Sequence, residues 1–448
     1  MRRRSIGIVC MWMAVMLIAN VGLAESDAKI FPYTVHQETL ENGLKAIVIP
    51  MKSGGLTSYW SVVRTGSRDE YEPGHSGFAH FFEHMMFRGT EAYPADRYNE
   101  IITRMGADAN AFTTDDLTAY HMSVGAQDLE QVVKIESDRF KNLSYAEEVF
   151  KTEAGAVYGE YRKNKMSPFF ALYEQVYAEA FEQHTYGHTT MGYERDIAAM
   201  PTMFDYSRSF FNRYYRPENV VLLIVGDVDP AATLNLVTEH YADWEPGYVM
   251  PTIVAEPEQT EERKVSVDYE GRSLPIVWLA YKAPAFDPTD VDWVAAYLLG
   301  ELAFGETSDI HKKLVLDEQR VQFVAGSLSI NRDPTVFDIY SRVKDPEDID
   351  AVIGELDSAV EYFREHPPAE DRLNALKSRM KYDFLMDLDT PDAVASTLAR
   401  FVAITGGVEC IDTLYGTMES VKPEDVQRAA RGVLVKSART VGVLQGAN

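Results

Sequence analysis

The segment from Gly74 to Thr90, GHSGFAHFFEHMMFRGT, contains histidine and glutamate at a spacing that could hold a metal ion. Residues four apart on an α-helix differ by about 40° in azimuth, so His80 and His84 would place both imidazoles on one face. Glu83 lies about 60° round from His80, close enough to take a proton from water at the metal without becoming a ligand. The order H-x-x-E-H is the inverzincin pattern and indicates a metal-binding helix, although histidines that only form hydrogen bonds would have the same spacing.

A third ligand is available in the segment Tyr145–Lys165, which is rich in Ala, Glu and Lys and predicts a second helix. Glu153 and Glu160 are seven residues apart, about 20° in azimuth, so both project from one face of that helix. Two neutral imidazoles, a carboxylate and an open fourth position make the His₂Glu donor set of a catalytic zinc site. The alternative is a solvated acidic face, because glutamate is almost never buried without a partner.

Several segments resemble, in the same order, those of the pitrilysin/insulinase family of zinc peptidases, in particular its bacterial members related to mitochondrial processing peptidase. Beside Gly74–Thr90, the resemblance rests on the spacing of 76 positions from His84 to Glu160 and on the second glutamate seven residues before Glu160. It also rests on four segments: TLENGLKAIVIP (Thr39–Pro50), VVRTGSRDE (Val62–Glu70), NAFTTDDLTAY (Asn110–Tyr120) and RPENVVLLIVGDVDP (Arg216–Pro230). The resemblance is strong in the first half of the chain and loose in the second.

The resemblance implies a role for five residues around one Zn²⁺ ion per chain. The ligands would be His80, His84 and Glu160. Glu83 would be the general base, and Glu153 a supporting acid that orients or polarises His80 or Glu160. The reaction implied is hydrolysis of peptide bonds in unfolded or extended peptides.

The resemblance also implies an edge strand to which the substrate is added in extended form. Its residues are Asn110, Ala111, Phe112 and Thr113. From the residues alone, an ordinary hairpin around Thr114–Asp116 is the alternative.

The second half departs from the family pattern at two positions. Active relatives often carry L-R-x-x-x-x-x-x-Y, whose Arg and Tyr bind the substrate and the developing oxyanion. Here Val315 stands in place of the arginine, and Gln322 or Phe323 in place of the tyrosine. We therefore expect a heterodimer with a homologous subunit that lacks H-x-x-E-H and supplies both donors, or else a homodimer. A non-catalytic binding or assembly subunit is the rival function, but such subunits usually lose metal ligands.

The elements that must position these residues fall into two similar halves. In the first, strands are expected at Ala46–Ile49, Ser58–Val63 and Val220–Val225. The Pro-rich and acidic segment Ala242–Lys264 predicts a linker. The second half repeats the plan, with strands near Pro275–Tyr281, Val324–Ile330, Phe337–Val343 and Thr440–Leu444 and helices near Val291–Phe304 and Asp348–Glu365.

The fold class expected is therefore α+β. Two similar α/β-sandwich halves, each a mainly antiparallel sheet with helices, would form half of a clamshell. A zinc-binding domain would span residues 30–245 and a homologous domain without metal residues 262–446. His184 and His188 are again four apart, but Gly187 and Thr189–Thr190 indicate a loop and make a second metal site a weak alternative.

The N-terminus has the pattern of a secretory signal peptide. Arg2–Arg4 precede an apolar run from Ile6 to Val21, and Gly22-Leu23-Ala24 is a small-residue cleavage site. Cleavage after residue 24 would release a periplasmic protein without stable membrane insertion; an uncleaved anchor is the alternative. The net charge of −26 would become −29 because three arginines are removed. Such an acidic chain is a poor partner for nucleic acid and favours basic peptides.

Overall fold

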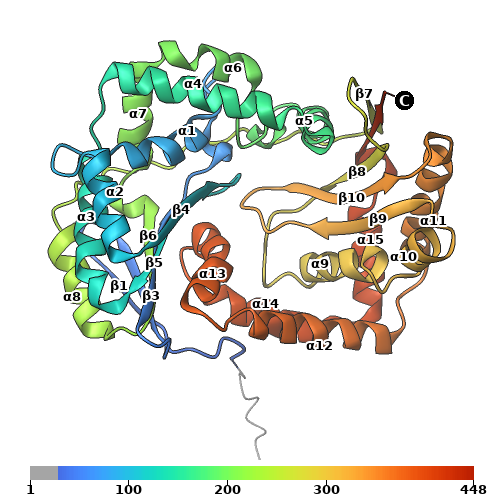
Figure 1. The fold of residues 1–448 in the computed structure, drawn as a ribbon. Helices are drawn as coiled ribbons and strands as arrows, with labels where there is room; N and C mark the ends of the chain where they lie inside the picture. Colours follow the sequence, from blue (N-terminus) through green and yellow to red (C-terminus); the bar gives the residue numbers. More distant parts are fainter. Residues whose placement is uncertain (1–28, 448) are drawn as a thin grey trace, which may run out of the picture.

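The computed structural model describes residues 29–447, which form two halves side by side, each built on one β-sheet (Figure 1). The strands of the first sheet are β1 His36–Thr39, β2 Lys45–Pro50, β3 Leu56–Val63, β4 Asp108–Thr113, β5 Thr118–Gly125 and β6 Val220–Gly226. Those of the second are β7 Arg263–Tyr269, β8 Ile276–Ala283, β9 Val321–Leu328, β10 Thr335–Val343 and β11 Arg439–Gly446. The predicted signal peptide, residues 1–24, lies outside the described residues and stays a prediction.

The two sheets share one topology, which confirms the predicted similarity of the halves. Their strand orders are β1-β2-β6-β3-β5-β4 and β7-β11-β8-β10-β9. β2 runs parallel to β6 and β7 runs parallel to β11, whereas all other neighbouring strands are antiparallel. β4 and β9 are therefore equivalent outer strands, and β1 is an addition to the first sheet.

The helices cover both sheets. Those of the first half are α1 Phe78–Met85, α2 Ala95–Met105, α3 Leu129–Asn142, α4 Glu147–Asn164, α5 Pro168–Ala180, α6 Glu194–Ala199, α7 Phe204–Tyr214 and α8 Pro230–Tyr241. Those of the second are α9 Val291–Phe304, α10 Asp309–His311, α11 Ile349–Glu365, α12 Glu370–Met386, α13 Pro391–Thr405, α14 Cys410–Ser420 and α15 Pro423–Val433. The predicted helix near Val291–Phe304 is confirmed at both ends, and the one near Asp348–Glu365 begins one residue later.

Two helices cross between the halves. α5 packs on β7, β8 and β11 of the second sheet, and α13 packs on β3 and β6 of the first (Figure 1). Each follows the long helix of its own half, α4 or α12, so the exchange is reciprocal. Each predicted domain, 30–245 and 262–446, thus contributes one helix to the sheet of the other.

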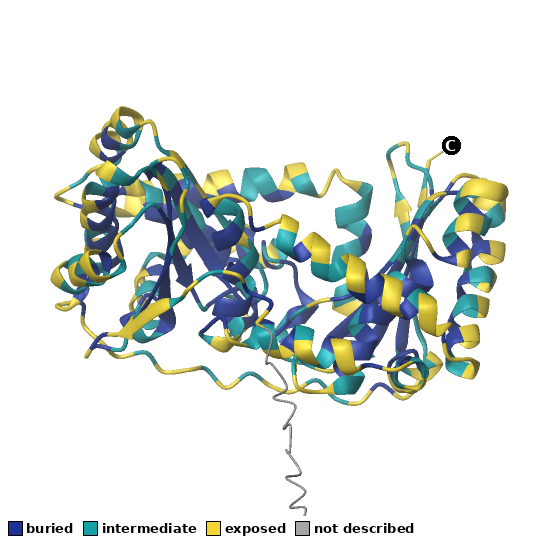
Figure 2. Ribbon diagram, turned by 90° about the horizontal axis from the view of Figure 1, so that it is seen from below, coloured by how far each residue is buried: buried dark blue, intermediate teal, exposed yellow. Residues whose placement is uncertain are grey.

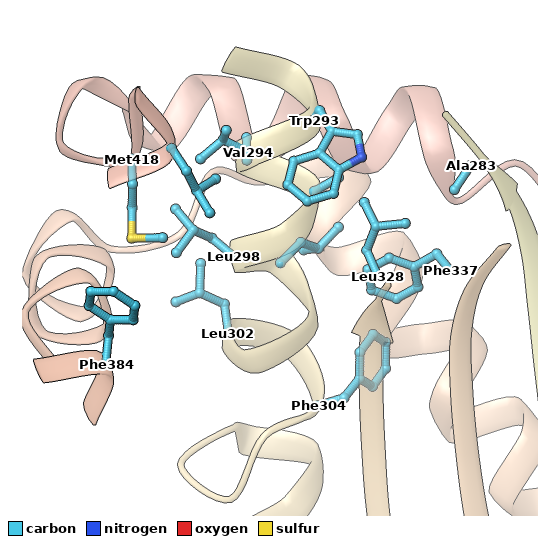
Figure 3. Close-up of a cluster of buried hydrophobic side chains, with 14 of the residues drawn as sticks. Ala283, Trp293, Val294, Leu298, Leu302, Phe304, Leu328, Phe337, Phe384 and Met418 are labelled. Atoms are coloured by element: carbon cyan, nitrogen blue, oxygen red, sulfur yellow. The ribbon is translucent and has the colours of Figure 1, made fainter. Parts of the chain in front are cut away.

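The core of the second half surrounds α9. Trp293, Leu298 and Phe304 of this helix pack among apolar residues that include Leu328 and Phe337 of the second sheet (Figure 3). Figure 2 shows the strands largely buried and the outward faces of the helices exposed. α9 follows β8 as α1 follows β3, but it is apolar on nearly every side, so it offers no polar face for a site.

The predicted linker contains no helix or strand between residues 242 and 262. Glu256 within it accepts hydrogen bonds from the backbone N–H groups of Glu182, Gln183 and His184, which attach the segment to the first half. Among the described residues, no single helix is long and apolar enough to cross a membrane; α13 and α14 meet that test only as a pair bent by 92°.

Candidate metal centre

The H-x-x-E-H segment forms α1, a helix of eight residues. It is preceded by Gly77, whose backbone φ of +92° is one that residues with a side chain rarely adopt. A Cβ atom on Gly77 would also lie 2.6 Å from the carbonyl oxygen of Met191. The apolar residues of the helix are buried in the core that it shares with α4 and α7; they are Phe78, Ala79, Phe81, Phe82 and Met85. The polar residues His80, Glu83 and His84 lie outside this core, where they face Glu160 of α4 and Thr113 of β4.

The three side chains predicted as ligands lie together. Glu160 Oε2 is 3.7 Å from His80 Nε2 and 3.4 Å from His84 Nε2. One ligand atom from each residue lies within 4.8 Å of the other two. Within residues 29–447, no other group of three or more His, Cys, Asp or Glu side chains is arranged to hold a metal ion.

This donor set fits a zinc ion. Ligand atoms about 2.0–2.2 Å from one tetrahedral zinc lie roughly 3.3–3.6 Å from each other. The two distances to Glu160 are close to that range. His80 is buried, whereas the Glu160 side chain is 38% exposed, so one side of the site is open to water or substrate. A tetrahedral site with three protein ligands and one open position is the catalytic type.

Glu153 supports His84, and its predicted contact with His80 or Glu160 is wrong. His84 Nδ1 lies 2.9 Å from Glu153 Oε1, and Arg88 forms an ion pair with the other carboxylate oxygen. The reason is that Glu153 lies two helical turns before Glu160 on α4, opposite His84 near the C-terminal end of α1 and Arg88 in the short 3-10 helix Met86–Arg88 that follows. Donation of the Nδ1 proton to Glu153 leaves Nε2 of His84 free to bind a metal.

The surroundings shift the pKa values of the two histidine ligands in opposite directions. Burial, together with the neighbouring His84, lowers the pKa of His80 to about 3, so this imidazole is neutral near pH 7. The hydrogen bond to Glu153 raises the pKa of His84. Burial favours the protonated form of Glu153, but the hydrogen bond from His84 and the charge of Arg88 outweigh it and lower the pKa of that carboxyl.

Glu83 is held beside the ligands by β4. Thr113 at the end of β4 donates its hydroxyl to Glu83 Oε2 at 2.7 Å. Burial raises the pKa of Glu83, which brings this carboxyl closer to the range in which a general base returns its proton readily. The contacts of Thr113 and Arg88 were not predicted, although Arg88 lies in the same motif, four residues after His84.

β4 is the outer strand of the first sheet, as predicted for Asn110, Ala111, Phe112 and Thr113. Asn110 and Ala111 line a pocket of about 310 Å³ together with Glu83, His84, Arg88 and Glu153. Phe112 is not part of this pocket, because its ring packs edge to face with Trp60 at 6.0 Å. β4 therefore lies along the candidate site: Asn110 and Ala111 line the pocket and Thr113 contacts Glu83, whereas the Phe112 ring points away toward Trp60.

The second half places no arginine and tyrosine at the two family positions. Val315 lies in the π-helical segment Lys312–Asp317 and packs against the core. Gln322 is exposed, and the Phe323 ring lies 5.8 Å from that of Tyr340.

His184 and His188 do not meet at a metal site. His184 Nε2 lies 2.9 Å from Asp333 Oδ2 of the second half, whereas His188 Nδ1 lies 2.9 Å from the Thr189 carbonyl oxygen. These contacts agree with the predicted loop, since the backbone around His184 is extended and only a short turn follows at Thr185–Gly187.

Comparison with known proteins identifies the family of the chain. The family model described as Insulinase (Peptidase family M16) matches residues 50–194, and the model described as Peptidase M16 inactive domain matches residues 204–380. The chain is 28% identical over 400 residues to zinc protease PqqE of Helicobacter pylori, with 88% of each protein covered. It is 24% identical over 427 residues to the beta subunit of mitochondrial-processing peptidase from Dictyostelium discoideum, with 91% of the chain and 88% of that subunit covered.

Solved structures agree with this relationship. A protease from Helicobacter pylori superposes with a TM-score of 0.87 at 26% identity, over 92% of this chain and 99% of that one. The periplasmic protease PqqL from Escherichia coli shares the fold, with a TM-score of 0.74 at 18% identity over 92% of this chain but only 47% of PqqL. The chain therefore belongs to the insulinase family of peptidases, family M16.

Proposed function

We propose that the chain is a zinc-dependent endopeptidase that hydrolyses unfolded or extended peptides. The observation that carries this proposal is the approach of Glu160 Oε2 to His80 Nε2 and His84 Nε2, with Glu83 beside them. His80, His84 and Glu160 would hold one zinc ion. When bound, zinc polarises the scissile carbonyl and makes water more acidic.

The residues of the chain would then move the proton and hold the ligands. Glu83 takes a proton from the attacking water and passes it to the leaving amine, as a half-buried carboxyl with a raised pKa can do. Thr113 orients Glu83 through its hydrogen bond, and Glu153 orients His84.

The substrate would lie along β4 as an added strand. Main-chain hydrogen bonds to a sheet edge select an extended chain, with little dependence on its side chains. Asn110 and Ala111 face the pocket beside Glu83 and so suit this role. The net charge of −26 favours basic peptides over acidic ones.

A homologous partner subunit would complete the active site. Val315, Gln322 and Phe323 offer no cationic donor at the two family positions. The chain also spans about half of PqqL and matches the separately solved first half of that protein with a TM-score of 0.75. A second subunit without H-x-x-E-H would supply the missing arginine and tyrosine, with a homodimer as the alternative. Export to the periplasm rests on residues 1–24.

One observation favours a second function, a non-catalytic binding or assembly subunit. Residues 204–380 match the inactive-domain model, and this part includes the positions of the missing donors. The complete His₂Glu set favours the enzyme, because a binding subunit has no use for a metal ligand set.

Substitution of Glu83 separates the two functions. We expect Glu83→Gln to keep one zinc per chain and to abolish peptide cleavage, since it removes the base and leaves the ligands. His80→Ala, His84→Ala and Glu160→Gln should lose the metal. The measurements are zinc content by mass spectrometry and cleavage of a mixed peptide library, made alone and with a co-purifying homologue. Stoichiometric zinc with unchanged cleavage in Glu83→Gln would exclude Glu83 as the base.

A further inference from the structure

The N-terminus of α1 is held by a carboxylate from outside the helix. Glu70 accepts hydrogen bonds from the backbone N–H of Gly77 at 2.7 Å and of Ala79 at 2.6 Å. The residue before the helix, Gly77, has no side chain that could cap it. In a helix of eight residues, the four N–H groups of the first turn have no partner within the helix, so Glu70 satisfies a large share of them.

Glu70 is buried and has no lysine or arginine partner. The residue is 4% exposed, and no basic side chain of the described residues except His188 comes within ion-pair distance of it. His188 Nε2 lies 3.9 Å from Glu70 Oε2 and is buried without a hydrogen-bond partner of its own. Burial raises the pKa of the Glu70 carboxyl to about 8. Near pH 7 this group therefore holds α1 through the hydrogen bonds from Gly77 and Ala79 rather than through a net charge, and His188 closes the pocket behind it.

The two histidine ligands differ in how they are held. Glu153 fixes the ring of His84 through Nδ1, whereas Nδ1 of His80 is buried and has no partner. Metal-binding histidines usually donate this second nitrogen to a carboxylate or a carbonyl group. The position of His80 therefore depends on the backbone of the first turn of α1, and that is the turn that Glu70 holds.

We infer that Glu70, backed by His188, is a positioning residue of the candidate metal centre: it fixes the first turn of α1 and with it the direction of the His80 imidazole. The inference rests on the proposed zinc site. It assigns a role to Glu70 and to the second histidine of the pair His184/His188, which the proposed mechanism does not use.

The test compares Glu70→Gln with the matched control Glu72→Gln. The Glu72 side chain bonds to Tyr206 and Arg213 and forms no hydrogen bond or ion pair with α1. We expect Glu70→Gln to retain the circular dichroism of the wild type but to bind zinc about tenfold or more weakly, the range seen for groups that support metal ligands. The visible spectrum of the Co²⁺-substituted protein should change as well. Glu72→Gln should match the wild type in both measurements.

A second measurement needs no variant. Coupling between two sites is reciprocal, so zinc binding should slow amide hydrogen exchange at Gly77 and Ala79 in the wild type. Gly55 is the control, because its N–H also donates to a carboxylate, that of Asp227, far along the chain. This measurement decides the matter if Glu70→Gln does not fold.

The outcomes distinguish the inference from the proposed function. Wild-type zinc affinity and Co²⁺ spectrum in folded Glu70→Gln, or unchanged exchange at Gly77 and Ala79, would overturn the role of Glu70 alone. A wild-type protein that binds no zinc would overturn both the metal site and this inference.

Discussion

Two buried carboxyl groups show how the neighbours of a single residue determine its pKa. Glu153 faces His84 and Arg88, and their combined effect lowers its pKa. Asp338 on β10 accepts hydrogen bonds from Trp278 Nε1 at 2.7 Å and the Tyr177 hydroxyl at 2.8 Å, but has no cation beside it. Burial therefore dominates and raises the pKa of Asp338 to about 7. Glu153 is stable as an anion near pH 7, and Asp338 is poised between its two forms.

The raised pKa of Asp338 predicts a pH-dependent stability. A carboxyl that binds its proton more tightly in the folded state stabilises the fold below its unfolded pKa, about 3.9, and this contribution is lost as the pH rises toward 7. We expect Asp338→Asn to gain stability relative to the wild type between pH 5 and pH 8, by at most about 3 kcal/mol. Urea unfolding of both proteins at the two pH values measures the difference. Parallel pH profiles would contradict the prediction.

At the scale of elements, the sequence predicts well the helices and turns that depend only on neighbouring residues. The apolar run of α9 and the turn at Thr114–Asp116 between β4 and β5 each depend on neighbouring residues, and both are confirmed. The H-x-x-E-H spacing likewise predicted which side chains share a face of α1. Helical spacing assigns a residue to a face, however, and not to a partner on another helix. For that reason Glu153 was expected beside His80 or Glu160 but lies beside His84.

The exchange of α5 and α13 could not be predicted from the sequence. Both helices carry apolar residues, but an apolar face does not specify which sheet it will cover, and the path of the folded chain decides this. β1 could not be predicted from the sequence either. All four of its residues are exposed, so it lacks the alternation of buried and exposed side chains that indicates a strand.

The register of β4 predicts which of its backbone groups are free for a substrate. The Thr114 N–H donates to the Leu117 carbonyl oxygen, and hydrogen-bonded pairs alternate with non-bonded pairs along an antiparallel ladder. The backbone N–H and C=O groups of Asn110 and Phe112 therefore face β5, whereas those of Ala111 face the open edge of the sheet. In this structure the Ala111 N–H donates to the Asn110 side-chain oxygen at 2.9 Å and not to β5, so a substrate strand would replace that side chain as the acceptor.

Ala111→Pro should therefore remove a substrate contact and leave the sheet intact, since proline is tolerated where an edge N–H faces outward. We expect a folded protein with unchanged zinc content and a kcat/KM on peptides at least about tenfold lower, from the loss of one backbone hydrogen bond in the transition state and the crowding of the added strand. Ala111→Ser keeps the N–H and serves as the control. Equal activity of the two variants would exclude pairing at Ala111.

At the scale of the whole molecule, the two halves are alike in topology but unlike in chemistry. The exchanged helices and the contact between His184 and Asp333 join them into one unit. Arg68 donates to Asp333 at 2.6 Å and strengthens this connection. The second half thus holds the first in place, yet its counterpart of α1, the apolar helix α9, carries no metal ligand. Residues 29–447 accordingly provide one candidate zinc site.

The absence of the two family donors predicts that this site works poorly alone. Removal of one donor that stabilises the oxyanion typically costs about 10²–10³ in kcat, and both Val315 and the Gln322–Phe323 pair lack the required group. We expect the purified chain to bind zinc but to cleave library peptides slowly, and cleavage to rise by about 10² or more when a homologue that lacks H-x-x-E-H and carries the arginine and tyrosine is added. Substitution of that arginine in the added subunit should abolish the gain, while Glu83→Gln in this chain should abolish cleavage altogether. High activity of the isolated chain as a monomer would contradict the need for a partner, and the same activity from a dimer of this chain alone would favour the homodimer, with some other residue as the donor.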